Sequence, residues 1–507
     1  MFPSIIGLLV LVYSAQCATL LRGGTFITYS EATSNLKIIT DGAMLFDDTI
    51  IAISDTIDGL DSHSNQANVQ TVNTTGKIIS PGFIDTHRHT WETVMRTLGP
   101  NVQLESYGWL FGSTGPAALI LSPEDIYISS LMGTLEGLNA GVTTTLDFAH
   151  MTWTRAHADA ALQGVIDSGA RVWWCYHVGP VVVSGDPYTV NTSAPIDQLA
   201  HIRELVKESP FNNGLVILGM SADPPTAEMV ETAQNVSINV ISTHDVEGPF
   251  GSSTTVISQT NDLTPGQPTL NSSIAFVFAH ASSFNPTEAR LLRQFNQYIS
   301  ITPESEMHYG HGHRSSYLIQ DQASLGVDTQ FTFSVDIISQ MRIWLQSTRL
   351  GLYQETLNRF KIPSNTPMTV RQAFLLGTRN GGLALRRPDL GVLKEGAKAD
   401  ILVFSTDAIG LVGWSDPVAA VVLHSNIADI EDVYVDGQLV KKGGKLVVDW
   451  QGKGFGDRLK ESAKNFRDAL AKTDITPFEV ALKGSLTDQD FQDPFQVDVT
   501  RGSGTGF

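Results

Sequence analysis

Eight apolar runs that alternate with helix-like stretches constrain the fold of this chain more than any other feature. They lie between residues 80 and 384. Continuous apolar runs such as 274–279 are typical of strands that are buried on both faces of a parallel sheet. Eight such strands suit an α/β fold, a closed (β/α)8 barrel of the TIM type. The runs end at Asp85, Phe148, His177, Ser221, His244, His280, Thr302 and Asp328.

Both ends of the chain carry short β-like runs outside this predicted barrel. Residues 18–79 contain several of them, separated by turns rich in Gly, Asp and Asn, and residues 385–450 return to the same texture. Such a pattern indicates a small β-unit.

In residues 451–507, an amphipathic stretch around 466–470 predicts a helix, and a polar, glycine-rich end follows it.

Composition and charge limit the partners that the chain can have. With 507 residues, 42% hydrophobic and 17% charged, it has an ordinary composition for a folded protein with one large barrel and a smaller unit. The net charge of −19 argues against binding to nucleic acid or to an anionic membrane. It favours a neutral or cationic small-molecule substrate. The sequence leaves assembly into a homo-oligomer open.

Residues 1–17 have the features of a signal peptide. The apolar run 5–12 is too short to span a bilayer but has the length of a signal core, and small residues follow at Ala15 and Cys17. We therefore expect secretion. The alternative is a first β-strand of a cytoplasmic enzyme, because no Lys or Arg precedes the run. Four Asn-x-Ser/Thr triplets agree with secretion. They begin at Asn73, Asn191, Asn235 and Asn271.

The strongest local signal is the segment 81–89, which reads Pro-Gly-Phe-Ile-Asp-Thr-His-Arg-His. Side chains at positions i and i+2 of a strand share a face, so His87 and His89 can point together into the mouth of a barrel. Two neutral imidazoles at this spacing suit zinc or iron. The same spacing recurs at His311 and His313, so the first pair gains its weight from the apolar run that it ends.

Three more residues of metal-ligand type follow apolar runs, namely His244, His280 and Asp328. In a barrel the carboxyl ends of all strands lie on one face, where active sites form. Each of these residues alone is more often a core or turn residue. Together with the histidine pair they predict a metal site. The chain has two cysteines, which excludes a thiolate zinc site.

These segments resemble the amidohydrolase superfamily, in its branch of cytosine deaminases, adenosylhomocysteine deaminases and triazine hydrolases. The similarity covers residues 19–450. It implies a barrel flanked by a β-sandwich that both chain ends form jointly, with residues 18–79 as one part and 385–450 as the other. The matching segments are 81–89, Ala-Gly-Val-Thr-Thr at 140–144, His-Asp-Val-Glu at 244–247, Leu-Gly-Val-Asp at 325–328, Met-Thr-Val at 368–370, 391–393 and Gly-Ala-Lys-Ala-Asp at 396–400.

The resemblance also implies a ligand set for one divalent metal, with zinc favoured over iron. Binuclear relatives bridge two metals with a modified lysine at the end of the fourth strand. The corresponding stretch here, 215–221, contains no lysine, which favours a single metal. His280 is implied either as a further ligand or as the residue that polarises the reacting water. The implied ligands are His87, His89, His244 and Asp328.

The same resemblance assigns roles in the reaction. Asp328 takes the proton from water, and His280 orients the nucleophile or stabilises the developing charge. Glu247 corresponds to a glutamate that shuttles protons in related deaminases. The expected reaction is hydrolysis of a non-peptide C–N bond of a small N-heterocycle, by deamination or by opening of a cyclic amide. The alternatives are a triazine-type dechlorinase or aminohydrolase and a metal-binding barrel without catalysis, which the intact ligand set argues against.

Substrate-binding residues are expected on the same face. Relatives carry Pro-x-Ser-Asn after the seventh strand, whereas this chain has Glu306 in place of Asn, which favours a cationic or donor-rich substrate. The branch often holds ribose with a glutamate near 115–118, where this chain has two alanines, which argues against nucleosides. Further expected contacts are Glu304 and His311 on the same loop, and His177, His150 and Trp91, which are equally compatible with packing.

Overall fold

The computed structural model describes residues 18–64, 68–246, 248–250, 255–313 and 315–484. The predicted signal peptide at 1–17 and the predicted proton shuttle Glu247 lie outside the described residues. Within the described part, no helix is both long enough and apolar enough to span a membrane.

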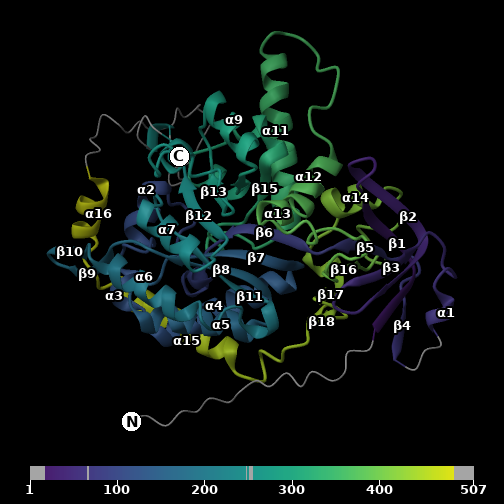
Figure 1. The fold of residues 1–507 in the computed structure, drawn as a ribbon, viewed down its shortest axis with the longest axis horizontal. Helices are drawn as coiled ribbons and strands as arrows, with labels where there is room; N and C mark the ends of the chain where they lie inside the picture. The colour runs from purple at the N-terminus through teal and green to yellow at the C-terminus, as the bar shows by residue number, and fades with distance from the viewer. Residues whose placement is uncertain (1–17, 65–67, 247, 251–254, 314, 485–507) are drawn as a thin grey trace, which may run out of the picture.

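An eight-stranded parallel sheet forms a barrel, with strand order β15-β14-β13-β12-β11-β8-β7-β6 (Figure 1). A parallel bridge between Arg88 and Asp328 connects the two outermost strands of this order. The predicted (β/α)8 barrel is therefore confirmed. The strands are β6 (Phe83–Arg88), β7 (Val142–Ala149), β8 (Arg171–His177), β11 (Val216–Ser221), β12 (Val240–Asp245), β13 (Ala275–His280), β14 (Tyr298–Ile301) and β15 (Ala323–Leu325).

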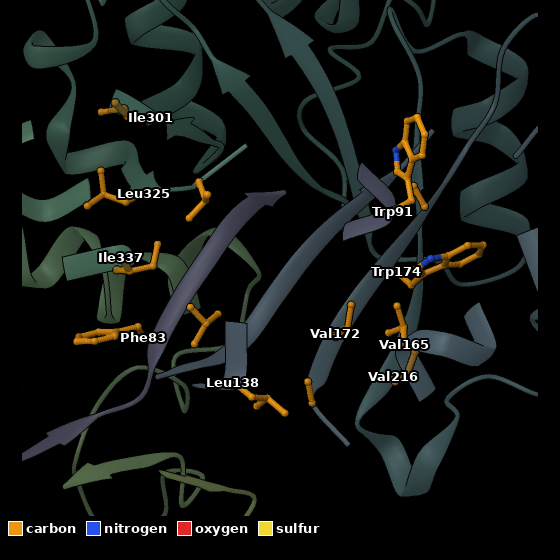
Figure 2. Close-up of a cluster of buried hydrophobic side chains, with 14 of the residues drawn as sticks. Phe83, Trp91, Leu138, Val165, Val172, Trp174, Val216, Ile301, Leu325 and Ile337 are labelled. Carbon is orange, nitrogen blue, oxygen red and sulfur yellow. The ribbon is translucent and has the colours of Figure 1, made fainter. Parts of the chain in front are cut away.

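The barrel strands are apolar on both faces, as parallel strands covered by helices must be. On β8, Val172 and Trp174 belong to the large core outside the barrel wall, whereas Trp173 and Cys175 belong to a separate cluster with residues of the other strands. This alternation follows from the two-residue period of a strand. Figure 2 shows part of the larger core, including Val172 and Trp174 with side chains from the neighbouring helices.

Helices follow the strands and cover the barrel. The longest in its first half, α4 (Pro123–Asn139), begins with a capping box in which Ser122 and Asp125 satisfy each other's backbone N–H groups. It packs closely on α5 (Arg155–Ser168). The contact has no room for a side chain at Gly164, where a Cβ would lie 2.5 Å from the carbonyl oxygen of Tyr127. The other covering helices include α6 (Ala194–Leu205), α7 (Ala227–Asn235), α8 (Val256–Asn261), α9 (Pro286–Phe295), α11 (Ile337–Leu357), α12 (Val370–Leu376) and α13 (Arg379–Ala384).

A second sheet of nine strands lies beside the barrel and is built from both ends of the chain (Figure 1). Its order is β19-β18-β17-β16-β5-β1-β2-β3, with β4 paired to β1. The central strand β5 pairs with β1 from one end and with β16 from the other, which confirms the predicted joint β-domain. Its strands are β1 (Ala18–Ser30), β2 (Asn35–Phe46), β3 (Ile50–Ser54), β4 (Val69–Asn73), β5 (Ile78–Pro81), β16 (Ile401–Phe404), β17 (Ile430–Val435), β18 (Gln438–Lys442) and β19 (Lys445–Leu446).

A buried ion pair joins this sheet to the barrel. The guanidinium of Arg171, at the start of β8, lies 3.0 Å from the carboxylate of Asp400 and 3.1 Å from that of Asp436. Arg171 and Asp400 are almost fully buried. At the end of the described chain, α15 (Phe455–Leu470) packs on α4 and agrees with the predicted C-terminal helix, and α16 (Thr476–Lys483) follows it.

Candidate metal centre

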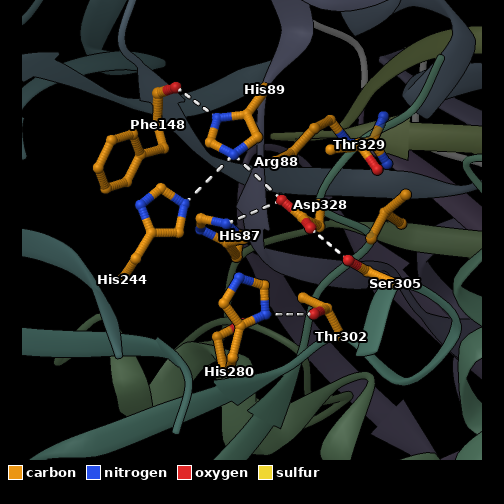
Figure 3. Close-up of polar contacts among 12 residues, drawn as sticks. His87, Arg88, His89, Phe148, His244, His280, Thr302, Ser305, Asp328 and Thr329 are labelled. Atoms are coloured by element: carbon orange, nitrogen blue, oxygen red, sulfur yellow. Dashed lines mark hydrogen bonds and ion pairs between the residues drawn. The ribbon is translucent and has the colours of Figure 1, made fainter. Parts of the chain in front are cut away.

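Four side chains at the carboxyl end of the barrel bring their ligand atoms within 4.8 Å of one another. A carboxylate oxygen of Asp328 lies 3.1 Å from Nε2 of His87 and 3.1 Å from Nε2 of His89 (Figure 3). The Nε2 atoms of His89 and His244 are 3.4 Å apart. All four predicted ligands are therefore gathered in one place, from the ends of β6 and β12 and from the turn after β15.

Two residues, one at the end of β13 and one in the turn after β15, adopt unusual backbone conformations. His280 has a φ of 70° and Asp328 a φ of 73°, in the left-handed region that residues with a side chain seldom occupy. Such residues persist where the surrounding structure holds them, and they cluster at functional sites. The approach of the chain before Asp328 requires Gly326, because a Cβ there would lie 2.9 Å from the backbone of His87.

Hydrogen bonds behind two of the histidines fix their orientation. Nδ1 of His89 lies 2.9 Å from the carbonyl oxygen of Phe148, to which it donates. Nδ1 of His244 donates to the carboxylate of Asp223 at 2.8 Å. Each bond places the ring proton on Nδ1 and leaves the lone pair of Nε2 for a metal, which is the usual arrangement of metal-binding histidines.

The donor set and its spacing fit one zinc-sized cation. Around a tetrahedral zinc ion with bonds of about 2.0–2.1 Å, neighbouring ligand atoms lie about 3.3 Å apart. Three of the six distances between ligand atoms, 3.1, 3.1 and 3.4 Å, agree with this spacing, and all six are within 4.8 Å. The fourth barrel strand, β11, has the sequence Val-Ile-Leu-Gly-Met-Ser and offers no lysine to bridge a second metal.

Burial and charge set the protonation of the cluster. Burial lowers the pKa of His87 to about 4, so this ring is neutral at working pH. Burial would raise the pKa of Asp328, but hydrogen bonds from His87 and His89 hold it well below its usual range. His89 differs, because its bond to Asp328 overcomes the effect of burial and raises its pKa to about 9. Binding of a cation must therefore displace a proton from His89.

A second layer of contacts surrounds Asp328 and the neighbouring His280. The hydroxyl of Ser305 donates to the second carboxylate oxygen of Asp328 at 2.5 Å. The ring of His280 lies 5.3 Å from that of His87 and 5.6 Å from that of His244, and its Nδ1 lies 2.7 Å from the hydroxyl of Thr302. Burial keeps the pKa of His280 well below its usual range, so the ring is neutral.

Residues 78–440 match the amidohydrolase family. The chain belongs to this family. This amidohydrolase is accordingly an enzyme, a metal-binding hydrolase of C–N bonds other than peptide bonds.

Two curated relatives are deaminases. A 5-methylthioadenosine/S-adenosylhomocysteine deaminase from Thermococcus kodakarensis is 24% identical over 433 residues, which cover 83% of this chain and 93% of that protein. A 5'-deoxyadenosine deaminase from Methanothermobacter thermautotrophicus is 24% identical over 430 residues, which cover 81% of this chain and 91% of that protein.

Solved structures share the fold at lower identity. An adenosine deaminase from Xanthomonas campestris with bound zinc has a TM-score of 0.71 at 16% identity and covers 90% of this chain and 99% of its own. An atrazine chlorohydrolase from Arthrobacter aurescens complexed with zinc has a TM-score of 0.70 at 20% identity, with 88% and 100% covered.

The predicted substrate-binding residues on one side of the centre lie close to it. The ring of His150 stacks on that of His89, with centroids 4.1 Å apart. His177, at the end of β8, lies 6.4 Å from His150 between ring centroids. Trp91 is fully buried and donates its indole N–H to Nδ1 of His150 at 2.8 Å, so it lies behind this ring. Contact of these three residues with a substrate stays a prediction.

On the other side, the loop predicted after the seventh strand is partly a helix, α10 (Pro303–His308). Glu306 is fully buried in it and accepts from the backbone N–H of Thr302 at 2.9 Å and from Nδ1 of His313 at 3.0 Å. The carboxylate of Glu304 bonds to the side chain of Gln340. The ring of His311 lies 4.9 Å from that of His280, so His311 is the predicted contact nearest to the centre on this side.

Sequence reasoning missed two acidic residues of this amidohydrolase. Asp223, which orients His244, follows the end of β11 by two residues. Glu92, three residues after His89 in the helical turn η1 (Thr90–Met95), is fully buried and accepts from the hydroxyl of Tyr107 at 2.7 Å. Burial raises the pKa of Glu92 to about 8. A sequence signal for both residues exists. Glu92 lies within three residues of a metal-type ligand at a strand end, and Asp223 lies within three residues of the end of a neighbouring strand.

Proposed function

We propose that this amidohydrolase is a zinc-dependent deaminase that replaces an amino group on a small N-heterocycle with oxygen. The observation that carries the proposal is the gathering of four ligand atoms within 4.8 Å, beside a neutral His280. The deaminase relatives point to the same class of reaction. A divalent cation held by these side chains supplies the Lewis acidity that makes water nucleophilic near neutral pH.

Residues of the chain accept the proton of the water and orient the water for attack. Asp328 accepts a proton from the attacking water, because its low pKa keeps it ionised and Ser305 holds its second oxygen. His280 accepts a hydrogen bond from the same water and sets its direction of attack. The new C–O bond forms at the ring carbon that carries the amino group, and the electron pair of the C=N bond moves to the adjacent ring nitrogen.

Breaking the C–N bond requires a proton on the leaving nitrogen. We assign this transfer to Glu247, which follows His244 by three residues in the sequence. Glu247 receives from Asp328 the proton that the water has lost and gives it to the amino group, which leaves as ammonia. The electron pair on the ring nitrogen then restores the C=N bond, and the oxygen stays on the ring carbon as the hydroxyl form of the product. Glu247→Gln should retain its metal and lose about 10²–10⁴-fold of its turnover, the range for general acid–base residues.

The substrate that we propose is a free heterocyclic base and not a nucleoside. Ala117, which begins the short helix α3 (Ala117–Ile120), is fully buried where the resemblance places a ribose-binding glutamate. The net charge of −19 also favours neutral or cationic rings over phosphorylated ones. Because buried polar groups of the site must be paired, the correct ring should be preferred strongly over an isostere without the amino group.

The test is ammonia release by the zinc-loaded enzyme across four groups of compounds: amino-heterocyclic bases, their nucleosides, cyclic amides and chlorotriazines. Turnover of at least one amino-heterocyclic base, lost in Asp328→Asn, supports the proposal. Turnover of cyclic amides or chlorotriazines alone would replace deamination by ring opening or dechlorination. A preference for nucleosides would refute the assignment of free bases.

Zinc in preference to iron is a part of the same proposal. The site offers three imidazole nitrogens and one carboxylate oxygen, which suit either metal, and the two structural relatives named above contain zinc. Reconstituting metal-free enzyme with each ion separately decides between them. Higher kcat/KM with iron(II) than with zinc would contradict our choice.

We also propose that the chain is secreted and glycosylated, as residues 1–17 indicate. The side chains at all four Asn-x-Ser/Thr sites are exposed, as a glycosylated asparagine must be. Expression of the full chain in a eukaryotic host tests this. A secreted product that begins after residue 17 and loses mass on treatment with a glycosidase supports the proposal, and retention of residues 1–17 inside the cell refutes it. The four sites are Asn73, Asn191, Asn235 and Asn271.

A further inference from the structure

We infer that Thr302, backed by Glu306, is a positioning residue that fixes the proton of His280 on Nδ1 and so presents its Nε2 lone pair to the reacting water. This inference rests on the proposed function for the identity of the reaction. The hydrogen-bonded series Glu306–Thr302–His280, which we call the relay, rests on the described contacts alone. The hydroxyl of Thr302 lies 2.7 Å from Nδ1 of His280 (Figure 3). The other ring nitrogen lies on the side of His87.

The direction of the hydrogen bonds follows from Glu306. Its two carboxylate oxygens already accept, one from the backbone N–H of Thr302 at 2.9 Å and the other from Nδ1 of His313 at 3.0 Å. The hydroxyl of Thr302 lies 3.5 Å from the first of these oxygens, and it must donate there because a carboxylate only accepts. Its lone pair then faces His280, which has to be the donor. The Nδ1–H tautomer of His280 follows.

The position of Thr302 in the fold supports a role beyond local structure. Thr302 is the N-cap residue of α10, and a threonine there usually accepts from a backbone N–H of the first helical turn. Its hydroxyl makes no such capping bond. It points instead to His280, while Glu306, in the first turn of α10, accepts a hydrogen bond from the backbone N–H of Thr302 itself. The hydroxyl is therefore available to the catalytic histidine.

This relay gives Glu306 a role other than contact with the substrate. Its side chain is fully buried and meets Thr302 and His313. His313 in turn packs edge-on against Trp344 of α11, with centroids 5.0 Å apart. These contacts connect His280 through Thr302, Glu306 and His313 to the helix α11. They hold the histidine ring from the side of Nδ1.

The role of the Thr302 hydroxyl is tested with two variants. Thr302→Val removes the hydroxyl at nearly constant shape, and Thr302→Ser keeps it. We expect Thr302→Val to lower kcat by about 10–100-fold, the usual loss on removing an outer hydrogen-bond partner, with KM and metal content unchanged. Thr302→Ser should restore most of kcat. Because the hydroxyl does not cap α10, neither variant should lose the helix, and circular dichroism and thermal unfolding check this.

A readout without turnover separates this inference from the proposed function. The ring 15N–1H spectrum of histidine-labelled, zinc-loaded protein reports which nitrogen of His280 carries the proton, with His280→Gln as the assignment control. We expect the Nδ1–H form in the wild type and in Thr302→Ser, and its loss in Thr302→Val. An unchanged tautomer in Thr302→Val would overturn the inference even if deamination were established. The expected tautomers with no deaminase activity would leave the relay standing and refute only the function.

Glu306→Gln distinguishes the relay from direct contact with the substrate. Glutamine keeps an oxygen that can accept from Thr302, so the relay predicts an unchanged KM and the same tautomer of His280. A change in the ratio of kcat/KM between amino and oxo heterocycles would instead place Glu306 in contact with the substrate and overturn its role in the relay.

Discussion

The carboxylate of Asp223 binds His244 twice, at 2.8 Å from Nδ1 of the ring and at 2.8 Å from the backbone N–H. The two residues come from neighbouring strands, since Asp223 follows β11 and His244 lies on β12. The contact fixes both the tautomer and the position of a candidate metal ligand. An acidic partner of this kind also makes the imidazole a stronger ligand.

We therefore predict that Asp223→Ala weakens metal binding by about 10–100-fold, as is usual for the loss of such a partner. Excess zinc should restore a large part of the activity, because His244 itself remains. Competition with a chromogenic chelator measures the affinity. Asp457→Ala on the exposed face of α15 is the control, and an affinity for zinc equal to that of the control would contradict the prediction.

Substitution of Ser305 tests how strongly turnover depends on the orientation of Asp328. Its hydroxyl donates to Asp328 at 2.5 Å in a fully buried setting. Hydrogen bonds to charged groups contribute about 1.5–3 kcal/mol, so Ser305→Ala should lower kcat by about 10–150-fold. Metal content should stay at the wild-type level, because His87 and His89 still hold the other oxygen of Asp328. Loss of the metal together with activity would show that Ser305 supports ligation and not proton transfer.

Glu92 should make stability depend on pH in the metal-free protein. Its pKa is raised from 4.5 to about 8 by burial, so the folded protein holds a proton that the unfolded chain releases above pH 4.5. Below pH 4.5 both states are protonated and nothing is lost. As pH rises from about 4.5 to about 8, this contribution to the free energy of unfolding falls, and above pH 8 it stays constant.

Glu92→Gln removes this titration and keeps an acceptor for the hydroxyl of Tyr107. The difference in melting temperature between the variant and the chelated wild type should therefore grow in favour of the variant from pH 5 to pH 8. Thermal unfolding at a series of pH values measures it. A difference that is the same at every pH would show that Glu92 keeps an ordinary pKa.

The buried pair of Arg171 and Asp400 should matter for stability and not for catalysis. Removing one partner of a buried ion pair usually costs about 3–5 kcal/mol, and Asp436 remains as a second partner, so Asp400→Asn should lie near the lower end. Arg171 begins the strand that His177 ends, about 20 Å away, so kcat should not change. Asp468→Asn in the exposed pair with Lys464 should leave unfolding unchanged. A loss of kcat in Asp400→Asn would contradict this division.

The barrel and the convergence of the candidate metal ligands could be predicted from the sequence because both depend on local patterns. Continuous apolar runs mark strands buried on both faces, and the carboxyl ends of parallel strands meet on one face of a barrel. Metal-type side chains at those ends must therefore converge, as His87, His89 and His244 do. Asp328 lies three residues beyond β15, and only the closing bridge to Arg88 brings it to the same place.

The surroundings of the site depend on how neighbouring segments pack, which no local pattern reveals. Contact of Trp91 with the substrate stays a prediction, and the bond from its indole N–H to His150 depends on the turn η1, which the sequence pattern did not indicate. Contact of Glu306 with the substrate also stays a prediction, and the sequence pattern did not indicate that its segment forms α10 with this side chain buried. Asp223 was missed because its partner His244 lies 21 residues later in the sequence.

A zinc titration of the metal-free enzyme tests the central claim most directly. Ammonia release from a verified amino-heterocycle is measured at increasing ratios of zinc to chain, with bound metal counted by elemental analysis in the same samples. A single site held by His87, His89, His244 and Asp328 predicts a linear rise in activity that stops at one equivalent. A rise that continues to two equivalents, or full activity in the chelated enzyme, would contradict a mononuclear metal-dependent hydrolase.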